Sequence, residues 1–263
     1  MLNMSPATDG EQRIDPTKEW WEVSTFPQPC NEASDASLRH VEQRASTPSS
    51  FPPQPMQRPE HLDPSLRSQP WHDPQEFPWC QDLERNFEAI RTEMLGTLSS
   101  QEAWPMVRGQ VGLTDGVGEW RELVMLGPGS ERGRALCPQT AALLDAIPAA
   151  KHLADSVGAC GNAIFAKLTP GTRLKPHSGP TNTRLTCHLG VEVPEKCAIR
   201  VGTKVCTWEE GKCLVFDDSW EHEVWNKSEL LRVVLLVNFW HPDLPSDKWT
   251  ETAEELRDGF LDY

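Results

Sequence analysis

Two histidines in polar stretches suggest a metal site. His177 opens the segment HSGPTNTRLTCHLG (177–190), and His222 lies within WEEGKCLVFDDSWEHEVWN (208–226). They are 222 − 177 = 45 residues apart, a separation that a jelly roll can close, because its hairpins bring distant strand ends to one mouth. Neutral imidazole with oxygen donors and open positions suits non-haem iron. A lone histidine is more often a hydrogen-bonded structural residue, so composition alone leaves both interpretations open.

An arginine in an apolar run suggests an anion site. Arg232 begins the hydrophobic sequence RVVLLVNFW. A buried charge without a partner is strongly destabilising, so this guanidinium needs an anion. A planar guanidinium can hold a carboxylate through two parallel hydrogen bonds. That carboxylate could belong to a bound ligand or to one of the acidic residues near His222, which are Asp217, Asp218, Glu221 and Glu223.

Alternating hydrophobicity predicts the strands that carry these groups. In residues 185–193 every second residue is apolar, and Arg184, Thr186 and His188 fall on the other face. A second long strand is predicted over 231–240. Shorter strands are predicted at Trp120–Leu126, Cys213–Phe216 and 223–225. Such a set of strands favours a two-sheet sandwich or jelly roll.

Helical periodicity is confined to the first half of the predicted domain. Leu83, Phe87, Ile90 and Met94 recur at spacings of four, three and four, as on one face of a helix. A second short helix is predicted over 138–147, ending before Pro148. Stripes of this kind are packing faces, so we expect these helices to flank the sheets.

Several ordered motifs resemble one known family. They are PGT (170–172), PHSGPTNTRL (176–185), CHLG (187–190), WEEGK (208–212), FDDSWEHEVWN (216–226) and WHP (240–242). Together they are similar to the aspartyl/asparaginyl β-hydroxylase family, and SLRSQPWHDP (65–74) and NFEAIR (86–91) resemble its N-terminal flank. The resemblance covers roughly residues 65–245, and its motifs occur in the family's order.

The resemblance implies a mainly β fold, a double-stranded β-helix (jelly roll, cupin-like) with flanking helices. It implies that His177 and His222 are the catalytic metal ligands, that the metal is Fe(II), and that 2-oxoglutarate and dioxygen are cosubstrates. Related oxygenases add a carboxylate two residues after the first histidine, where this chain has Gly179. The family tolerates that gap, with water filling the position. The implied reaction is hydroxylation of an unactivated carbon, of the Asp/Asn side-chain type, in a peptide or protein substrate.

The resemblance also assigns cosubstrate-binding residues. Arg232 matches the family's cosubstrate arginine, and His188 matches a histidine near the cosubstrate. We assign Arg184 and Thr186 to the same pocket, although Thr186 stands where family members usually have arginine.

A second departure from the family is Ala166, which stands where a serine is usual. Arg184 and Lys167, adjacent to the two departures, are candidates to compensate for them. The alternative function is a non-catalytic metal- or ligand-binding jelly roll with a degraded cosubstrate site. Retention of His177, His188, His222 and Arg232 argues against it, because a scaffold needs none of these groups that are costly to bury.

Composition narrows the partners and the compartment. A formal net charge of −14 repels phosphate backbones and excludes nucleic acid as a partner. No stretch approaches the ~20 apolar residues that cross a bilayer, so we expect no membrane anchor. The N-terminus has early acidic residues and no apolar signal core, which predicts a cytoplasmic protein. The eight cysteines include no C-x-x-C pair and are expected to be reduced thiols.

The chain divides into three predicted parts. Residues 1–64 are expected to form a disordered Pro-rich tail, because the stretch STPSSFPPQPMQRP (46–59) can sustain neither a helix nor a central strand. Residues 65–250 form the oxygenase domain, and residues 251–263 a short C-terminal tail.

Overall fold

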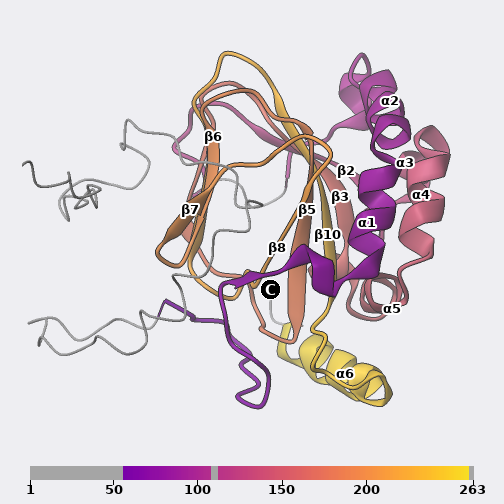
Figure 1. The fold of residues 1–263 in the computed structure, drawn as a ribbon, viewed down its shortest axis with the longest axis vertical. Helices are drawn as coiled ribbons and strands as arrows, with labels where there is room; N and C mark the ends of the chain where they lie inside the picture. Colours follow the sequence, from indigo (N-terminus) through magenta and orange to yellow (C-terminus); the bar gives the residue numbers. More distant parts are fainter. Residues whose placement is uncertain (1–55, 108–111, 261–263) are drawn as a thin grey trace, which may run out of the picture.

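Two antiparallel β-sheets lie face to face in the computed structural model, which describes residues 56–107 and 112–260 (Figure 1). The larger sheet has the strand order β1-β8-β5-β10-β3-β2, and the smaller has the order β4-β9-β6-β7. Helices cover the outer face of the larger sheet. The predicted jelly roll with flanking helices is therefore confirmed. Most of the predicted Pro-rich tail, residues 1–55, lies outside the described residues.

Five of the ten strands in the described residues were predicted from the sequence, and each of the five is present. The predictions at Trp120–Leu126 and Cys213–Phe216 are confirmed, and the strand predicted at 223–225 gains one residue at each end. The strand bounds are β1 Trp71–His72, β2 Trp120–Leu126, β3 Ala163–Leu168, β4 Arg173–His177, β5 Arg184–Glu192, β6 Cys197–Val201, β7 Lys204–Cys206, β8 Cys213–Phe216, β9 His222–Asn226 and β10 Arg232–Trp240.

The helices differ from the prediction in two places. The stripe from Leu83 to Met94 is divided between two helices that meet at Asn86. Pro148 was expected to end a helix, yet it also begins the next one, where its missing N–H costs nothing. The helix bounds are α1 Pro78–Arg85, α2 Phe87–Thr97, α3 Glu131–Leu136, α4 Pro138–Asp145, α5 Pro148–Val157 and α6 Trp249–Phe260.

Strand β5 separates two hydrophobic cores. Its residues Leu185, Cys187, Leu189 and Val191 pack in the core that the helices cover. The second core lies between the sheets and includes Ile164, Ala166, Val224 and Val234. Both faces of β5 are buried. His188, on the face opposite Leu189, therefore points into the space between the sheets.

The ends of the described chain pack on the domain. Residues 251–260, predicted to be a tail, form most of α6, which buries Ala253 and Leu256. The C-terminal prediction is therefore wrong for this segment. At the other end, Gln57 forms an isolated bridge with Trp220, close to His222, and His61 forms one with Thr181. The prediction of a disordered tail is therefore wrong for residues 57–61.

Two further expectations concern the cysteines and the membrane. Cys206 is disulfide-bonded, so the expectation that all eight cysteines are reduced is wrong. Among the described residues, every helix is too short or too polar to cross a bilayer.

Candidate metal and cosubstrate site

The two predicted ligand histidines lie side by side. His177 ends β4, His222 begins β9, and the two are directly paired in the antiparallel register. Their ring centroids are 4.1 Å apart. The Nδ1 atom of His177 lies 2.7 Å from the carbonyl oxygen of Lys175, and that of His222 lies 3.0 Å from the carbonyl oxygen of Trp220. An N–H donated at each Nδ1 leaves both Nε2 lone pairs available to a metal.

Burial keeps both histidines neutral. Desolvation, followed by the charge of His222, lowers the pKa of His177 to about 3. Desolvation also lowers the pKa of His222, against the opposing effect of Asp218. Because a metal binds the neutral imidazole, the pair is in its ligating form across the physiological range.

The carboxylate of Asp218 lies beside the histidine pair and next to Gly179, the position where related oxygenases have a ligand carboxylate. A Cβ built on Gly179 would lie 2.5 Å from Cγ of Asp218 and 2.6 Å from each of its carboxylate oxygens. Asp218 Oδ2 accepts a hydrogen bond from Arg184 Nη2 at 2.6 Å, whereas the buried Oδ1 has no partner. No third His, Cys, Asp or Glu of the described residues groups with both histidines at ligand spacing. Asp218 therefore lies next to the ligand pair and outside it.

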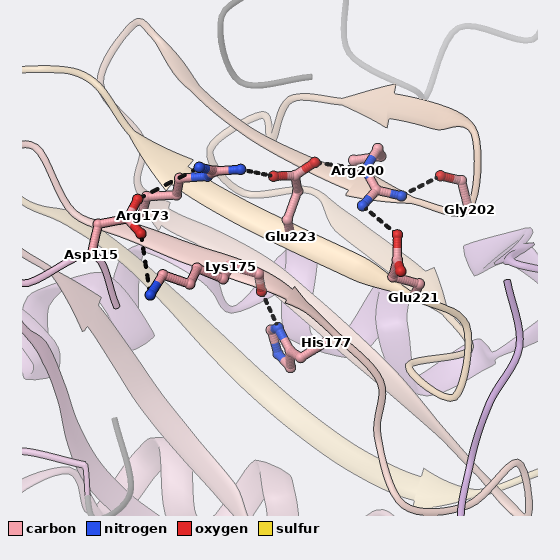
Figure 2. Close-up of polar contacts among 8 residues, drawn as sticks. All are labelled: Asp115, Arg173, Lys175, His177, Arg200, Gly202, Glu221 and Glu223. Carbon is pink, nitrogen blue, oxygen red and sulfur yellow. Dashed lines mark hydrogen bonds and ion pairs between the residues drawn. The ribbon is translucent and has the colours of Figure 1, made fainter. Parts of the chain in front are cut away.

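Two of the other acidic residues near His222, Glu221 and Glu223, are paired with arginines (Figure 2). Glu223 accepts hydrogen bonds from Arg173 at 3.0 Å and from Arg200 at 2.7 Å. Arg200 also donates to Glu221 at 2.9 Å, and both Arg200 and Glu223 are almost fully buried. This network ties β4, β9 and β6 together, so it supports the strands that carry the histidines.

Asp217 belongs to the turn before β9. Its Oδ1 accepts a hydrogen bond from the Ser219 amide at 2.9 Å. Burial raises the pKa of Asp217 to about 7. Of the four carboxylates near His222, only Asp218 has a buried oxygen without a hydrogen-bond partner among the described residues.

Arg232 is a buried cation with unused donors. Its side chain is 2% exposed, and its Cζ atom lies 4.0 Å from the centroid of the Trp208 ring. Burial lowers the pKa of Arg232 to about 10, so the group stays charged. Its Nε and Nη2 atoms lack hydrogen-bond partners, and no carboxylate of the described residues forms a salt bridge with it. The sequence left open a salt bridge between Arg232 and one of the acidic residues near His222. The described residues contain no such salt bridge.

A row of neighbouring rings, from Trp208 through His188 and Phe216, connects Arg232 to the histidine pair. Trp208 Nε1 donates to Nδ1 of His188 at 3.3 Å, and the buried Nε2 of His188 has no partner. The His188 ring lies 5.0 Å from that of Phe216, which lies 5.9 Å from that of His222. The contributions of Trp208 and Phe216 were missed in the sequence, although each lies within a motif quoted above.

Thr186, Arg184 and Lys167, the other residues expected at the cosubstrate pocket, lie in three different places. Thr186 donates to Asn238 Oδ1 at 2.9 Å, on the inner face shared with His188. Arg184 is bound to Asp218, so it lies nearer to the histidine pair than to Arg232. The ammonium of Lys167 lies 4.5 Å from the centroid of the Trp104 ring, on the helix-covered side of the sheet. Lys167 therefore does not face the space beside Ala166, and its expected compensation for that residue is wrong.

Comparison with known proteins shows the family to which the chain belongs. The family model for aspartyl/asparaginyl beta-hydroxylase matches residues 84–242. An ornithine lipid ester-linked acyl 2-hydroxylase of Rhizobium tropici is 38% identical over 185 residues, covering 67% of this chain and 62% of that protein. The human aspartyl/asparaginyl beta-hydroxylase is 36% identical over 186 residues, covering 68% of this chain and 24% of that protein.

The chain thus spans less than two thirds of either relative. A solved prolyl-4-hydroxylase of Pseudomonas putida matches with a TM-score of 0.40 and 16% identity, over 59% of this chain and 87% of that one. The matched range contains both histidines, Asp218, His188 and Arg232. The chain belongs to the aspartyl/asparaginyl β-hydroxylase family.

Proposed function

We propose that this protein is an iron(II)- and 2-oxoglutarate-dependent dioxygenase that hydroxylates an unactivated carbon, of the Asp/Asn side-chain type, in a peptide or protein. The observation that carries the proposal is the buried guanidinium of Arg232, whose Nε and Nη2 have no partner in the described chain. Such a group is costly unless an anion binds it. Arg232 lies at one end of the row of rings described above, and the histidine pair lies at the other end.

The side chains present fit an iron ion. His177 and His222 would hold it through Nε2, since each Nδ1 is already hydrogen-bonded to a backbone carbonyl. The unpartnered Oδ1 of Asp218 would accept a hydrogen bond from a water at the metal. Bound iron supplies the activation of dioxygen, coupled to conversion of 2-oxoglutarate into succinate and carbon dioxide.

The residues at the other end fit the distal carboxylate of 2-oxoglutarate. Nε and Nη2 lie on one edge of a guanidinium, so Arg232 can donate two parallel hydrogen bonds to one carboxylate. The ring of Trp208 fixes the plane of that guanidinium. His188 accepts from Trp208 at Nδ1, which leaves its Nε2 to donate to the same carboxylate. The protein thereby orients the cosubstrate and excludes water from it.

The test is iron-dependent formation of succinate from 2-oxoglutarate by the full chain, with and without a peptide library rich in Asp and Asn. We expect peptide-stimulated turnover that His177→Ala abolishes. Addition of fatty-acyl lipids in place of peptides separates a lipid acceptor from a peptide acceptor. A folded protein that binds iron but forms no succinate with any acceptor would favour the non-catalytic alternative.

A further inference from the structure

Three buried cysteines meet on the opposite side of the large sheet. Cys80 belongs to α1, Cys187 to β5 and Cys213 to the start of β8. Each is at most 1% exposed. Their sulfur atoms all lie within 4.8 Å of one another, and those of Cys80 and Cys187 are 3.9 Å apart. Within the described residues this is the one such group of three His, Cys, Asp or Glu ligands.

Secondary structure brings the three sulfurs together. Leu189 pairs with Cys213 and Cys187 pairs with Val215, so Cys187 and Cys213 are diagonal neighbours on one face of β5 and β8. Helix α1 lies over this face and supplies Cys80 from its first turn. Glu84, one turn later, accepts hydrogen bonds from the Cys213 amide and the Lys212 ammonium, both at 3.0 Å. These contacts fix α1 against β8, so the sulfur triangle is formed before any ligand binds.

We propose that Cys80, Cys187 and Cys213 form a binding site for a thiophilic metal ion, with zinc as the expected occupant. A zinc–sulfur bond of about 2.3 Å in tetrahedral geometry separates neighbouring sulfurs by about 3.8 Å. The observed 3.9 Å between Cys80 and Cys187 matches that edge. The Cys213 sulfur lies within 4.8 Å of the other two, so a slight contraction of the cluster would bring it to the same distance.

The charges around the cluster fit a thiolate-bound zinc ion. Zinc with three thiolates carries one net negative charge, and the ammonium of Lys212 beside Cys213 is the nearby cation.

Such an ion would join α1 to the sheet behind the strand that carries His188. It is distinct from the iron proposed above, because Cys187 and His188 point to opposite faces of β5. Metal binding at a structural site of this kind contributes to folding stability. It uses none of the groups assigned to the cosubstrate.

The test measures metal content in the full chain produced in zinc-supplemented culture and purified with a thiol reductant and without chelators. We expect one zinc per chain in a His177→Ala/His222→Ala variant, in which the histidine site cannot take up zinc. Introduced into that variant, Cys80→Ser and Cys213→Ser should each lower the zinc content by more than about tenfold, because each removes a direct ligand. Cys137→Ser is the matched control and should retain zinc. Production in cobalt medium should give a sulfur-to-cobalt charge-transfer absorption that only the cluster variants lose.

Circular dichroism melting establishes that each variant is folded. If the cluster variants do not fold, X-ray absorption on the His177→Ala/His222→Ala protein decides, because the proposal requires sulfur neighbours around zinc at about 2.3 Å. A folded parent without sulfur-bound metal would overturn the proposal. Retention of zinc by folded Cys80→Ser and Cys213→Ser proteins would do the same.

Discussion

The carboxylate of Asp218 occupies the space that a side chain on residue 179 would need. A Cβ on Gly179 would lie 2.5 Å from Asp218 Cγ, which no real structure tolerates. The Gly179 amide also donates to the Asp218 backbone carbonyl at 2.6 Å. Residue 179 lacks the ligand carboxylate of related oxygenases, and the carboxylate of Asp218, from a neighbouring loop, fills that space. Arg184 holds Asp218 through Oδ2.

A carboxylate exchange tests this relationship. We expect Gly179→Asp alone to displace Asp218, break its salt bridge with Arg184 and impair iron binding. Adding Asp218→Gly makes room for the new side chain, so the double variant should bind iron better than Gly179→Asp alone. Anaerobic iron titration measures both. Equal affinities of the single and double variants would show that the two positions do not share one space.

Halide should not replace oxygen in the product. In oxygenases that lack the carboxylate ligand, the open position can accept a halide, but here a carboxylate lies beside it. Negative charge near the metal disfavours a second anion and favours a hydrogen-bonded water. Turnover in high chloride or bromide should give only a product heavier by one oxygen atom derived from dioxygen, with halide at most inhibiting. Halogenated product in the mass spectrum, or activation by halide, would contradict this expectation.

Each histidine of the pair should be essential for iron binding. His177→Ala or His222→Ala leaves one protein ligand, which is insufficient to hold a labile divalent ion. Anaerobic titration with iron(II) should show no tight binding by either variant. His152→Gln, whose ring packs against Trp240 and Trp249 far from β4, is the control. A variant that binds iron like the parent would reassign that histidine to a structural role.

Removing the Arg232 guanidinium should weaken the cosubstrate far more than the metal. Loss of one partner of a buried charge pair costs about 2 to 5 kcal/mol, so Arg232→Met should raise the Kd for 2-oxoglutarate about 30-fold or more. Lys167→Met removes the matched cation that lies over Trp104 on the other side of the sheet, and should leave that Kd unchanged. Equal loss of iron and 2-oxoglutarate affinity in Arg232→Met would indicate unfolding instead.

Stability should fall with acid through His72. Burial, then the charge of His241, lowers its pKa to about 3. Below the unfolded value of about 6.5, the unfolded chain binds a proton that the folded chain does not. The free energy of unfolding therefore decreases as pH falls from about 6.5 towards 3. By about pH 5 this one group accounts for up to roughly 2 kcal/mol.

His72→Gln should remove that contribution and flatten the decline. Urea denaturation at about pH 7 and about pH 5, analysed by linear extrapolation, compares the two proteins. Parallel declines in parent and variant would mean that His72 is already solvated or protonated in the folded state.

Alternation and motif order predicted five of the ten strands in the described residues, because side chains of a strand report its two faces directly. The same rule shows that Lys167 cannot occupy the face of Ala166, since adjacent residues point to opposite sides. Helix ends were harder to predict: Pro148 suits both the end of one helix and the start of the next, and only packing decides.

Part of the site could be predicted from a single residue that requires a binding partner. Contacts between residues of separate loops could not be predicted in this way. The buried Arg232 implied an anion from its position in an apolar strand. The approach of Asp218 to Gly179 depends on how the loop before β9 folds over the end of β4. No local sequence pattern predicts that approach, and none predicts the salt bridge between Arg184 and Asp218.

Strand β4 is one of the two edge strands of the smaller sheet, and it carries one of the two proposed metal ligands at its last residue. Edge strands fray more easily than central ones, and fraying of β4 would carry His177 away from His222 without unfolding the rest of the domain. The rate of metal loss is then set by this local opening. Amide hydrogen exchange along β4 should therefore slow when iron binds, whereas exchange in the central strand β10 should stay the same.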